Sequence, residues 1–305
     1  MVAAKRKAKK PGLLSHGRSP HLTTKKTAAS LSAKATATII RTHHQLQKAH
    51  AQAIKASDHG KAAEIQKRID EQGGLKTYQV ASITGQSSER GGDSSRVLVE
   101  WLRELDLPSA YQKAEGGAPE GRKCRLLEVG ALSTDNVCSK ARYLDVERID
   151  LHSQAPGILQ QDFMERPRAK SEKDRFDIIS LSLVLNYVPD AEGRGEMLKR
   201  TCTFLRRPGD LGGDAGESAL AKLPIPCLFL VLPAPCVTNS RYLDRRRLEQ
   251  IMNSLSYVLL REKVTAKLCY QLWKLQGKQE GRGQKFQKVE VNPGAKRNNF
   301  SVIVE

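Results

Sequence analysis

The feature that most constrains this 305-residue chain is a change of hydrophobic period near residue 124. From there on, short apolar runs of strand length alternate with segments of helical spacing. The run 176–185 is apolar on both faces, as expected of a central strand in a parallel sheet covered on two sides. The pattern predicts an α/β fold with a mostly parallel sheet. The expected strands are 124–130, 146–151, 158–163, 176–185, 227–232, 257–260, 267–275 and 299–304, and the expected helices are 192–205 and 242–255.

The residues before 124 have a different composition. Residues 1–32 are rich in Lys, Ser, Thr and Pro, which predicts a disordered basic tail. Residues 33–75 carry apolar side chains at helical spacing and end at two glycines, which predicts a helical hairpin. We expect a loop at 79–95, a helix at 96–105, and one α/β domain over 94–305.

Positive charge is concentrated at the two ends of the chain. The net charge is +18, with 12 basic and no acidic residues in 1–57, and 10 basic and 4 acidic residues in 261–305. Basic segments attract phosphate backbones by releasing their counterions, so a nucleic acid is the expected partner. We expect backbone contact from 34–72 and 277–297. The cluster at 5–10 also resembles a nuclear targeting signal.

Several classes of protein are disfavoured. No apolar run reaches the roughly 20 residues of a membrane-spanning helix, and we expect no secretory signal and no membrane association. Six scattered cysteines without a CxxC pair argue against a zinc ribbon or a disulfide scaffold. His43, His44 and His50 have no cysteine or acidic ligand nearby, so we expect surface histidines and no metal. P-loop, HExxH and GxSxG motifs are absent.

Chemistry is expected at the carboxyl ends of the strands, where open α/β sheets bind ligands. Glu128 and Gly130 end the first expected strand, and Asp150 follows Gly130 by 20 residues, a spacing typical of nucleoside-binding folds. Asp162 and Phe163 end the third strand and could flank an adenine. A single glycine in place of GxGxxG argues against NAD and FAD and is compatible with S-adenosylmethionine (SAM). From spacing alone, Gly130 could equally just end a strand and Asp150 just cap a turn.

Six longer strings follow one another along the chain, at 126–130, 148–153, 161–167, 176–189, 194–198 and 233–242. In this order they resemble the fungal 25S ribosomal RNA adenine-N1 methyltransferase family. The resemblance implies a Rossmann-like class I fold with a seven-stranded sheet, an N-terminal helical extension, and SAM as the cofactor. It also implies an adenine of large-subunit ribosomal RNA as substrate, pre-ribosomal particles as partners, and a nuclear, nucleolar location. The resemblance implies that Gly130 and Asp150 bind SAM, and we expect Glu128 and Asp162 to belong to the same cofactor site.

The target base is expected to lie next to Asn186 and Tyr187, which follow the fourth strand. Tyr187 could stack on adenine and Asn186 could bond to its edge, although a core aromatic and a helix cap are the alternatives. The sequence departs from the broader class I pattern in two linkers, 130–146 and 152–157, which are too short for clear helices. Two other functions stay open: a non-catalytic SAM sensor or scaffold, and a SAM enzyme acting on protein or a small molecule.

Overall fold

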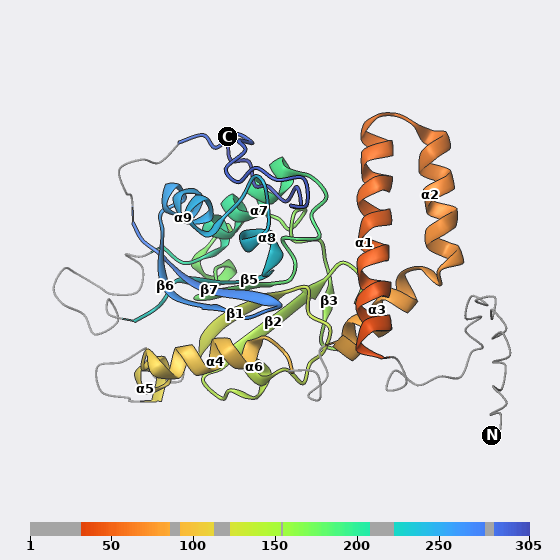
Figure 1. Ribbon diagram of the computed structural model, residues 1–305. Helices are drawn as coiled ribbons and strands as arrows, with labels where there is room; N and C mark the ends of the chain where they lie inside the picture. The colour runs from red at the N-terminus through yellow and green to blue at the C-terminus, as the bar shows by residue number, and fades with distance from the viewer. Residues whose placement is uncertain (1–31, 86–91, 113–122, 154, 208–222, 278–283) are drawn as a thin grey trace, which may run out of the picture.

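A seven-stranded sheet forms the centre of the molecule (Figure 1). The computed structural model describes residues 32–85, 92–112, 123–153, 155–207, 223–277 and 284–305. The strand order is β3-β2-β1-β4-β5-β7-β6, in which β1 to β5 pair in parallel and β7 runs antiparallel to both of its neighbours. The strands are β1 (Cys124–Val129), β2 (Leu144–Asp150), β3 (Leu159–Gln160), β4 (Ile178–Ser182), β5 (Cys227–Pro233), β6 (Tyr257–Val264) and β7 (Leu268–Leu275).

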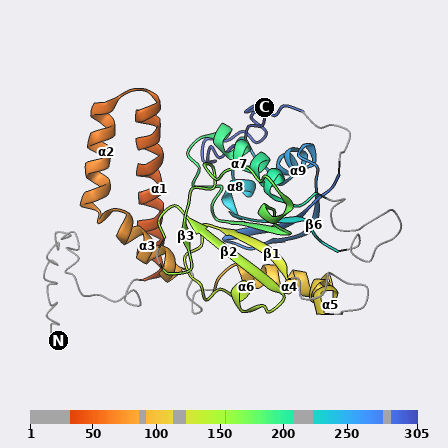
Figure 2. The ribbon, with the colours of Figure 1, turned by 180° about the vertical axis from the view of Figure 1, so that it is seen from behind.

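Helices cover both faces of the sheet, as the apolar strand β4 requires (Figures 1 and 2). Each face has its own buried apolar cluster. One face carries α4 (Ser95–Glu104), α5 (Leu107–Gln112) and the single turn α6 (Val137–Lys140), and the other carries α7 (Ala191–Phe204), α8 (Pro235–Thr238) and α9 (Arg245–Ser254). A short 3-10 turn, Glu172–Asp174, precedes β4. None of the described helices is both long and apolar enough to cross a membrane.

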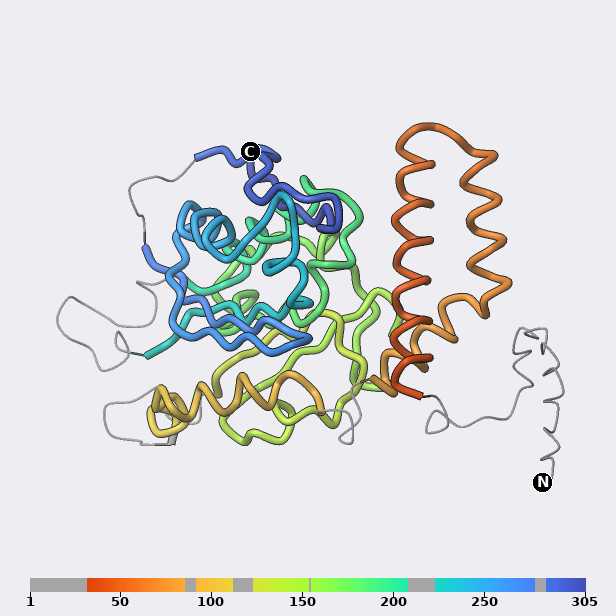
Figure 3. The backbone as a smooth tube through the Cα atoms, viewed as in Figure 1, coloured from red at the N-terminus to blue at the C-terminus, as the bar shows by residue number. Residues whose placement is uncertain are grey.

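The N-terminal helices form a hairpin that stands beside the sheet (Figure 3). It consists of α1 (Ala33–Lys55) and α2 (His59–Glu71), which pack through a small apolar cluster of their own. The expected hairpin is therefore confirmed, and the expected tail lies almost entirely outside the described residues. The expected loop at 79–95 is wrong over its first part, because a third helix, α3 (Gly74–Gly85), occupies it. Ala81 is fully buried, and Gln79 donates to the carbonyl of His152. These contacts with distant residues stabilise the helix, and the local composition does not indicate them.

The C-terminal segment also differs from the expectation. Residues 299–304 form no ladder strand and make only an isolated bridge between Val304 and Phe286. The segment lies on α7 instead, where the amide of Ile303 donates to the carbonyl of Ala191 at 3.0 Å. A Cβ on Gly195 would stand 1.7 Å from the carbonyl oxygen of Ile303, so only glycine permits this approach.

The two short linkers follow the expectation within the described residues. Between β1 and β2 the chain forms only the four-residue α6, and residues 151–153 and 155–158 form turns without a helix. The third expected strand, 158–163, is reduced to the two residues of β3. Both linkers therefore leave the loops at the carboxyl edge of the sheet short.

Candidate functional site

The parallel strands bring the expected site residues to one edge of the sheet. Val129 pairs with Ile149 of β2 and with Leu181 of β4, so β1, β2 and β4 end at the same level. Asp150 pairs with Gln160, which places the end of β3 beside them. The segments that carry Gly130, Asp150, Asp162 and Asn186 therefore meet at the carboxyl edge, where such sheets bind ligands.

Gly130 makes the turn that follows β1. Its φ is +76°, a left-handed conformation that strongly favours glycine. Its amide donates to the carbonyl of Ile149 at 2.8 Å, which ties the turn to β2. A Cβ at this position would lie 2.6 Å from Cγ2 of Val184. The missing side chain keeps the backbone here open to close approach from the edge of the sheet.

Asp150 ends β2 as a half-buried carboxylate. Its Oδ1 accepts a hydrogen bond from the amide of His152 at 2.8 Å. This oxygen therefore caps the turn after β2, as one of the two interpretations of the sequence expected. Within the described residues, the other oxygen accepts no hydrogen bond and stays available to a ligand. Burial raises the pKa of Asp150, and the bond from His152 opposes that shift. Asp162 has a similar arrangement, with Oδ1 accepting from the amide of Met164 at 2.7 Å.

Glu128 differs from the other expected ligands because its carboxylate faces the loop after β1. Asn136 Nδ2 donates to Oε1 at 2.6 Å, and the thiol of Cys138 lies 3.9 Å from Oε2. Arg148 Nε also lies 3.9 Å from Oε2, at the limit of an ion pair. Burial raises the pKa of Glu128 to about 7. The structure thus gives Glu128 a role in holding the loop that follows Gly130.

The segment before α4 reinforces that loop. Asp93 Oδ2 accepts from the amide of Val137 at 3.2 Å, and Ser95 Oγ accepts from the amide of Cys138 at 3.0 Å. The hydroxyls of Ser94 and Ser182 lie 2.6 Å apart and connect the same segment to the end of β4. Sequence reasoning recognised only a possible helix cap at Ser94 or Ser95. These partners, 43 to 88 residues away, leave no local signal.

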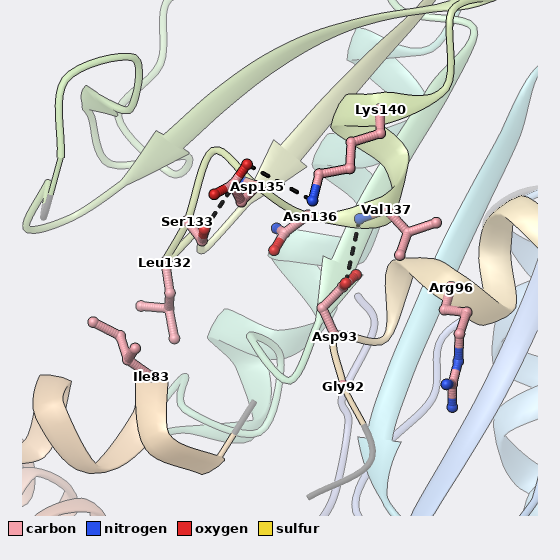
Figure 4. A pocket seen from close by; sticks show the side chains of 10 residues that line it. All are labelled: Ile83, Gly92, Asp93, Arg96, Leu132, Ser133, Asp135, Asn136, Val137 and Lys140. Atoms are coloured by element: carbon pink, nitrogen blue, oxygen red, sulfur yellow. Dashed lines mark hydrogen bonds and ion pairs between the residues drawn. The ribbon is translucent and has the colours of Figure 1, made fainter. Parts of the chain in front are cut away.

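A cavity of about 440 Å³ opens directly beside this loop (Figure 4). The start of α4 and the loop after β1 form most of its wall, and Ile83 of α3 closes one side. None of the expected cofactor ligands lines it, so the cavity adjoins the edge with Gly130 and Asp150 without including it. Its lining residues are Ile83, Gly92, Asp93, Arg96, Leu132, Ser133, Asp135, Asn136, Val137 and Lys140.

Aromatic rings of the N-terminal helices contact the expected base site. The centroid of the Tyr187 ring lies 3.7 Å from that of His44 on α1 and 6.1 Å from that of Tyr78 on α3. His43 is buried and stacks on Tyr78, and His44 and His50 are half-buried. The expectation of surface histidines is therefore wrong for this helix. The rings of Tyr78 and Tyr187 bury His43 and His44. The described residues contain no group of metal ligands.

The strand order, with one antiparallel strand inserted next to the last parallel one, is that of a class I, Rossmann-like methyltransferase. A glycine turn after β1 and an acid at the end of β2 stand where such folds bind a nucleoside.

The chain belongs to the family described as "25S rRNA (adenine(2142)-N(1))-methyltransferase, Bmt2", whose sequence model matches residues 63–302. The 25S rRNA (adenine(2142)-N(1))-methyltransferase of Saccharomyces cerevisiae is 37% identical over 241 residues, which are 79% of this chain and 63% of that protein. The 25S rRNA adenine-N(1) methyltransferase of Schizosaccharomyces pombe is 38% identical over 265 residues, or 87% of this chain and 89% of that protein.

Solved structures give a weaker likeness. The N-methyltransferase NodS of Bradyrhizobium japonicum, in complex with S-adenosyl-L-homocysteine, is 15% identical with a TM-score of 0.34, over 58% of this chain and 86% of that one. An O-methyltransferase family protein of Burkholderia thailandensis is 10% identical with a TM-score of 0.41, over 82% and 75%. Both TM-scores are below 0.5, so we assign the class I methyltransferase fold from the strand order.

Proposed function

We propose that this chain transfers a methyl group from SAM to N1 of an adenine in large-subunit ribosomal RNA. One observation carries the proposal: the sheet brings the Gly130 turn, the available oxygen of Asp150 and the Asn186–Tyr187 pair to one edge. That combination would hold a nucleoside cofactor and a base side by side. The family membership supplies the choice of base and RNA.

The residues at this edge fit SAM. The available Asp150 oxygen can accept hydrogen bonds from the ribose hydroxyls, and the left-handed turn at Gly130 allows a ligand to lie against the backbone. Asp162 stands one strand further along the edge, where the adenine of the cofactor would lie. When bound, SAM supplies a methyl group on a positively charged sulfur. Glu128 acts behind this site by fixing the loop through Asn136.

No general base is needed for this reaction. Adenine N1 has an in-plane lone pair, so it forms the new N–C bond without first losing a proton. Bound SAM would give up its methyl group and keep the electron pair of the S–C bond on sulfur, so the adenine ring would carry the positive charge. The task of the protein is therefore alignment of N1 with the methyl group at near-attack distance. N1 is hidden in a base pair, so the adenine must be unpaired or flipped out.

Asn186 and Tyr187 are the residues that we assign to the target base. Asn186 Oδ1 is buried and has no hydrogen-bond partner among the described residues. A side-chain amide can pair with the N6 and N7 edge of adenine, and this pairing leaves N1 free for the methyl group. Tyr187 offers a ring for stacking. Leu183, which lies between β4 and this pair, has a φ of +58°, a strained conformation of the kind found at functional sites.

A row of positive charges on α1 would position the RNA. The helix contains no acidic residue, and Lys34, Arg41, Lys48 and Lys55 recur every seven residues. Seven residues advance a helix by about 10.5 Å with a drift of only about 20°, so the four lie along one side. Lys48 is half-buried, and its pKa is lowered by burial and then by Arg194 on α7. The row therefore runs beside the α/β domain.

The family resemblance also points to a cellular setting. We propose that the chain acts on pre-ribosomal particles in the nucleolus.

The row can be tested by the salt dependence of RNA binding. Arg41→Gln should reduce the slope of log affinity against log salt by about 0.7, the value of one phosphate contact on single-stranded nucleic acid. Lys67→Gln removes the same charge from the exposed surface of α2 and should change the slope less. Equal slopes for both variants would place the RNA elsewhere.

The activity can be tested on unmodified 25S ribosomal RNA made by transcription in vitro. The RNA is incubated with the chain and SAM, digested to nucleosides and analysed for 1-methyladenosine by mass spectrometry. We expect about one 1-methyladenosine per molecule with the parent chain and almost none with Asp150→Ala. Asp150→Asn keeps an acceptor for His152 but loses the charge, so it should be intermediate. SAM binding by the parent without any 1-methyladenosine would favour the sensor function.

A further inference from the structure

Four aromatic rings from three separate elements meet where the target base is expected. His43 and His44 come from α1, Tyr78 from α3, and Tyr187 from the segment after β4. His44 and Tyr78 have ring centroids 5.4 Å apart, and both contact Tyr187. Tyr78 and Tyr187 belong to none of the three apolar clusters formed by the described residues. The rings therefore form a separate aromatic group between the N-terminal helices and the sheet edge.

One polar atom of this group, and one of the residue that precedes Tyr187, are buried and lack partners. Nε2 of His44 and Oδ1 of Asn186 are both buried without a hydrogen-bond partner among the described residues. Unpaired buried polar atoms destabilise a fold, and in native proteins nearly all are satisfied. A base that enters this place offers hydrogen-bonding groups along its edge. The unpaired atoms therefore indicate a ligand that is polar at its edge and flat enough to lie among rings.

The rings also suit the charge of the product. Methylation at N1 leaves a positive charge on the adenine ring, and the faces of neutral aromatic rings attract a cation. Burial lowers the pKa of His44 to about 3, with smaller contributions from His43 and Lys48, so its ring is neutral at physiological pH. Burial likewise raises the pKa of Tyr187 and of Tyr78, so both phenols keep their protons. No charge on these rings opposes the charge that develops on the base.

We propose that the N-terminal helices supply the second wall of the target-base pocket, so that the adenine is held between Tyr187 on one side and His44 and Tyr78 on the other. The proposal rests on the proposed function and extends it to residues outside the α/β domain. His44 and Tyr78 become residues that touch the substrate.

The pocket is closed in this structure. A centroid separation of 3.7 Å between His44 and Tyr187 is direct contact, and a base between two rings needs about 3.5–4.0 Å on each of its faces. Entry of the adenine therefore requires α1 to move away from Tyr187 by roughly the thickness of one ring. The hydrogen bond from Gln79 Nε2 to the carbonyl of His152, 3.2 Å long, joins α3 to the loop after Asp150 and must break or move with α3.

The experiment compares substitutions at His44 that change its charge or its ring. His44→Phe keeps a neutral ring, His44→Leu removes the ring, and His44→Lys places a cation in the pocket. Gln47→Lys adds the same charge one turn away on the exposed side of α1 and serves as the control. For each protein, kcat and KM are measured with transcribed 25S ribosomal RNA, and binding of S-adenosylhomocysteine is measured by calorimetry.

We expect His44→Phe to keep kcat within about threefold of the parent, because the neutral ring face remains. His44→Lys should lower kcat on the order of 100-fold, as expected for a cation about 5 Å from the charge that develops on the base. His44→Leu should fall between the two. Binding of S-adenosylhomocysteine should be unchanged in all of them, and Gln47→Lys should keep the kcat of the parent. Tyr78→Leu should lower kcat, and Tyr78→Phe should not.

Two results would overturn the proposal. One is a parental kcat in His44→Lys. The other is a loss of S-adenosylhomocysteine binding in step with kcat, which would place His44 in the cofactor site or in the fold. If the parent chain itself forms no 1-methyladenosine, the proposed function fails, and this inference fails with it. If the parent is active and His44→Lys is as active, only this inference fails.

Discussion

Acidification should weaken the folded chain through His44, and the structure sets the size of the effect. The pKa of His44 lies near 3 in the folded chain, against 6.5 for an ordinary histidine. The unfolded chain therefore binds a proton between these values that the folded chain does not, so the free energy of unfolding falls as the pH falls through this window. From pH 8 to pH 5 the loss is about 1.5 pH units at 1.36 kcal/mol each, or about 2 kcal/mol.

The measurement is urea unfolding of the parent and of His44→Phe at pH 8 and pH 5, followed by circular dichroism. Phenylalanine fills a similar volume and does not titrate, so the variant should lose about 2 kcal/mol less than the parent on acidification. Other titrating groups, such as His43, are present in both chains and cancel in the difference. His59→Phe, at an exposed histidine of α2, should follow the parent. Equal losses in the parent and in His44→Phe would refute the burial of His44 against Tyr187.

Three further outcomes follow from the structure. Gly130→Ala and Gly92→Ala should each cost about 1–2 kcal/mol, because both glycines are left-handed. Only Gly130→Ala, whose Cβ meets Val184, should also weaken S-adenosylhomocysteine binding in calorimetry. Gly195→Ala should destabilise by about 1–3 kcal/mol or more through its contact with Ile303. Gly60→Ala in α2, where an added Cβ would meet only Asp58 Oδ1 at 3.9 Å, should stabilise by about 0.5–1 kcal/mol in the same urea titration. Glu128→Gln keeps the acceptor for Asn136 and removes a charge whose pKa is about 7, so it should stabilise the chain at pH 8 by up to about 3 kcal/mol and have little effect near pH 4.5.

Much of the α/β domain could be predicted from the sequence. Strand periodicity located β1, β2, β4 and β5 to within two residues, except for the carboxyl end of β4. The period of the apolar residues indicates which side chains are buried, because every second side chain of a strand points to the same face. The 20-residue spacing from Gly130 to Asp150 correctly placed the two at neighbouring strand ends, since parallel strands end together. Whether these residues bind the cofactor stays a prediction.

The local signals failed where distant segments decide the structure. The Ser/Gly-rich composition of 79–95 predicts a loop, yet α3 forms because it packs against α1 and because Gln79 donates to the carbonyl of His152. Apolar residues at 299–304 predict a strand, yet the segment packs on α7, where Gly195 leaves room for it. In both cases the partner that provides the stabilising burial is distant in the sequence, so neighbouring residues carry no trace of it.

The sequence by itself determined the alternation of strands and helices, the basic ends and the order of the site residues, because these depend on residue types at fixed local spacings. Only the tertiary structure decided which side chains meet. It turned Glu128 toward Asn136, tied Asp93 and Ser95 to the loop after β1, and brought His44 against Tyr187. Such contacts depend on how whole elements pack, and packing is decided by the shape and burial of the complete chain.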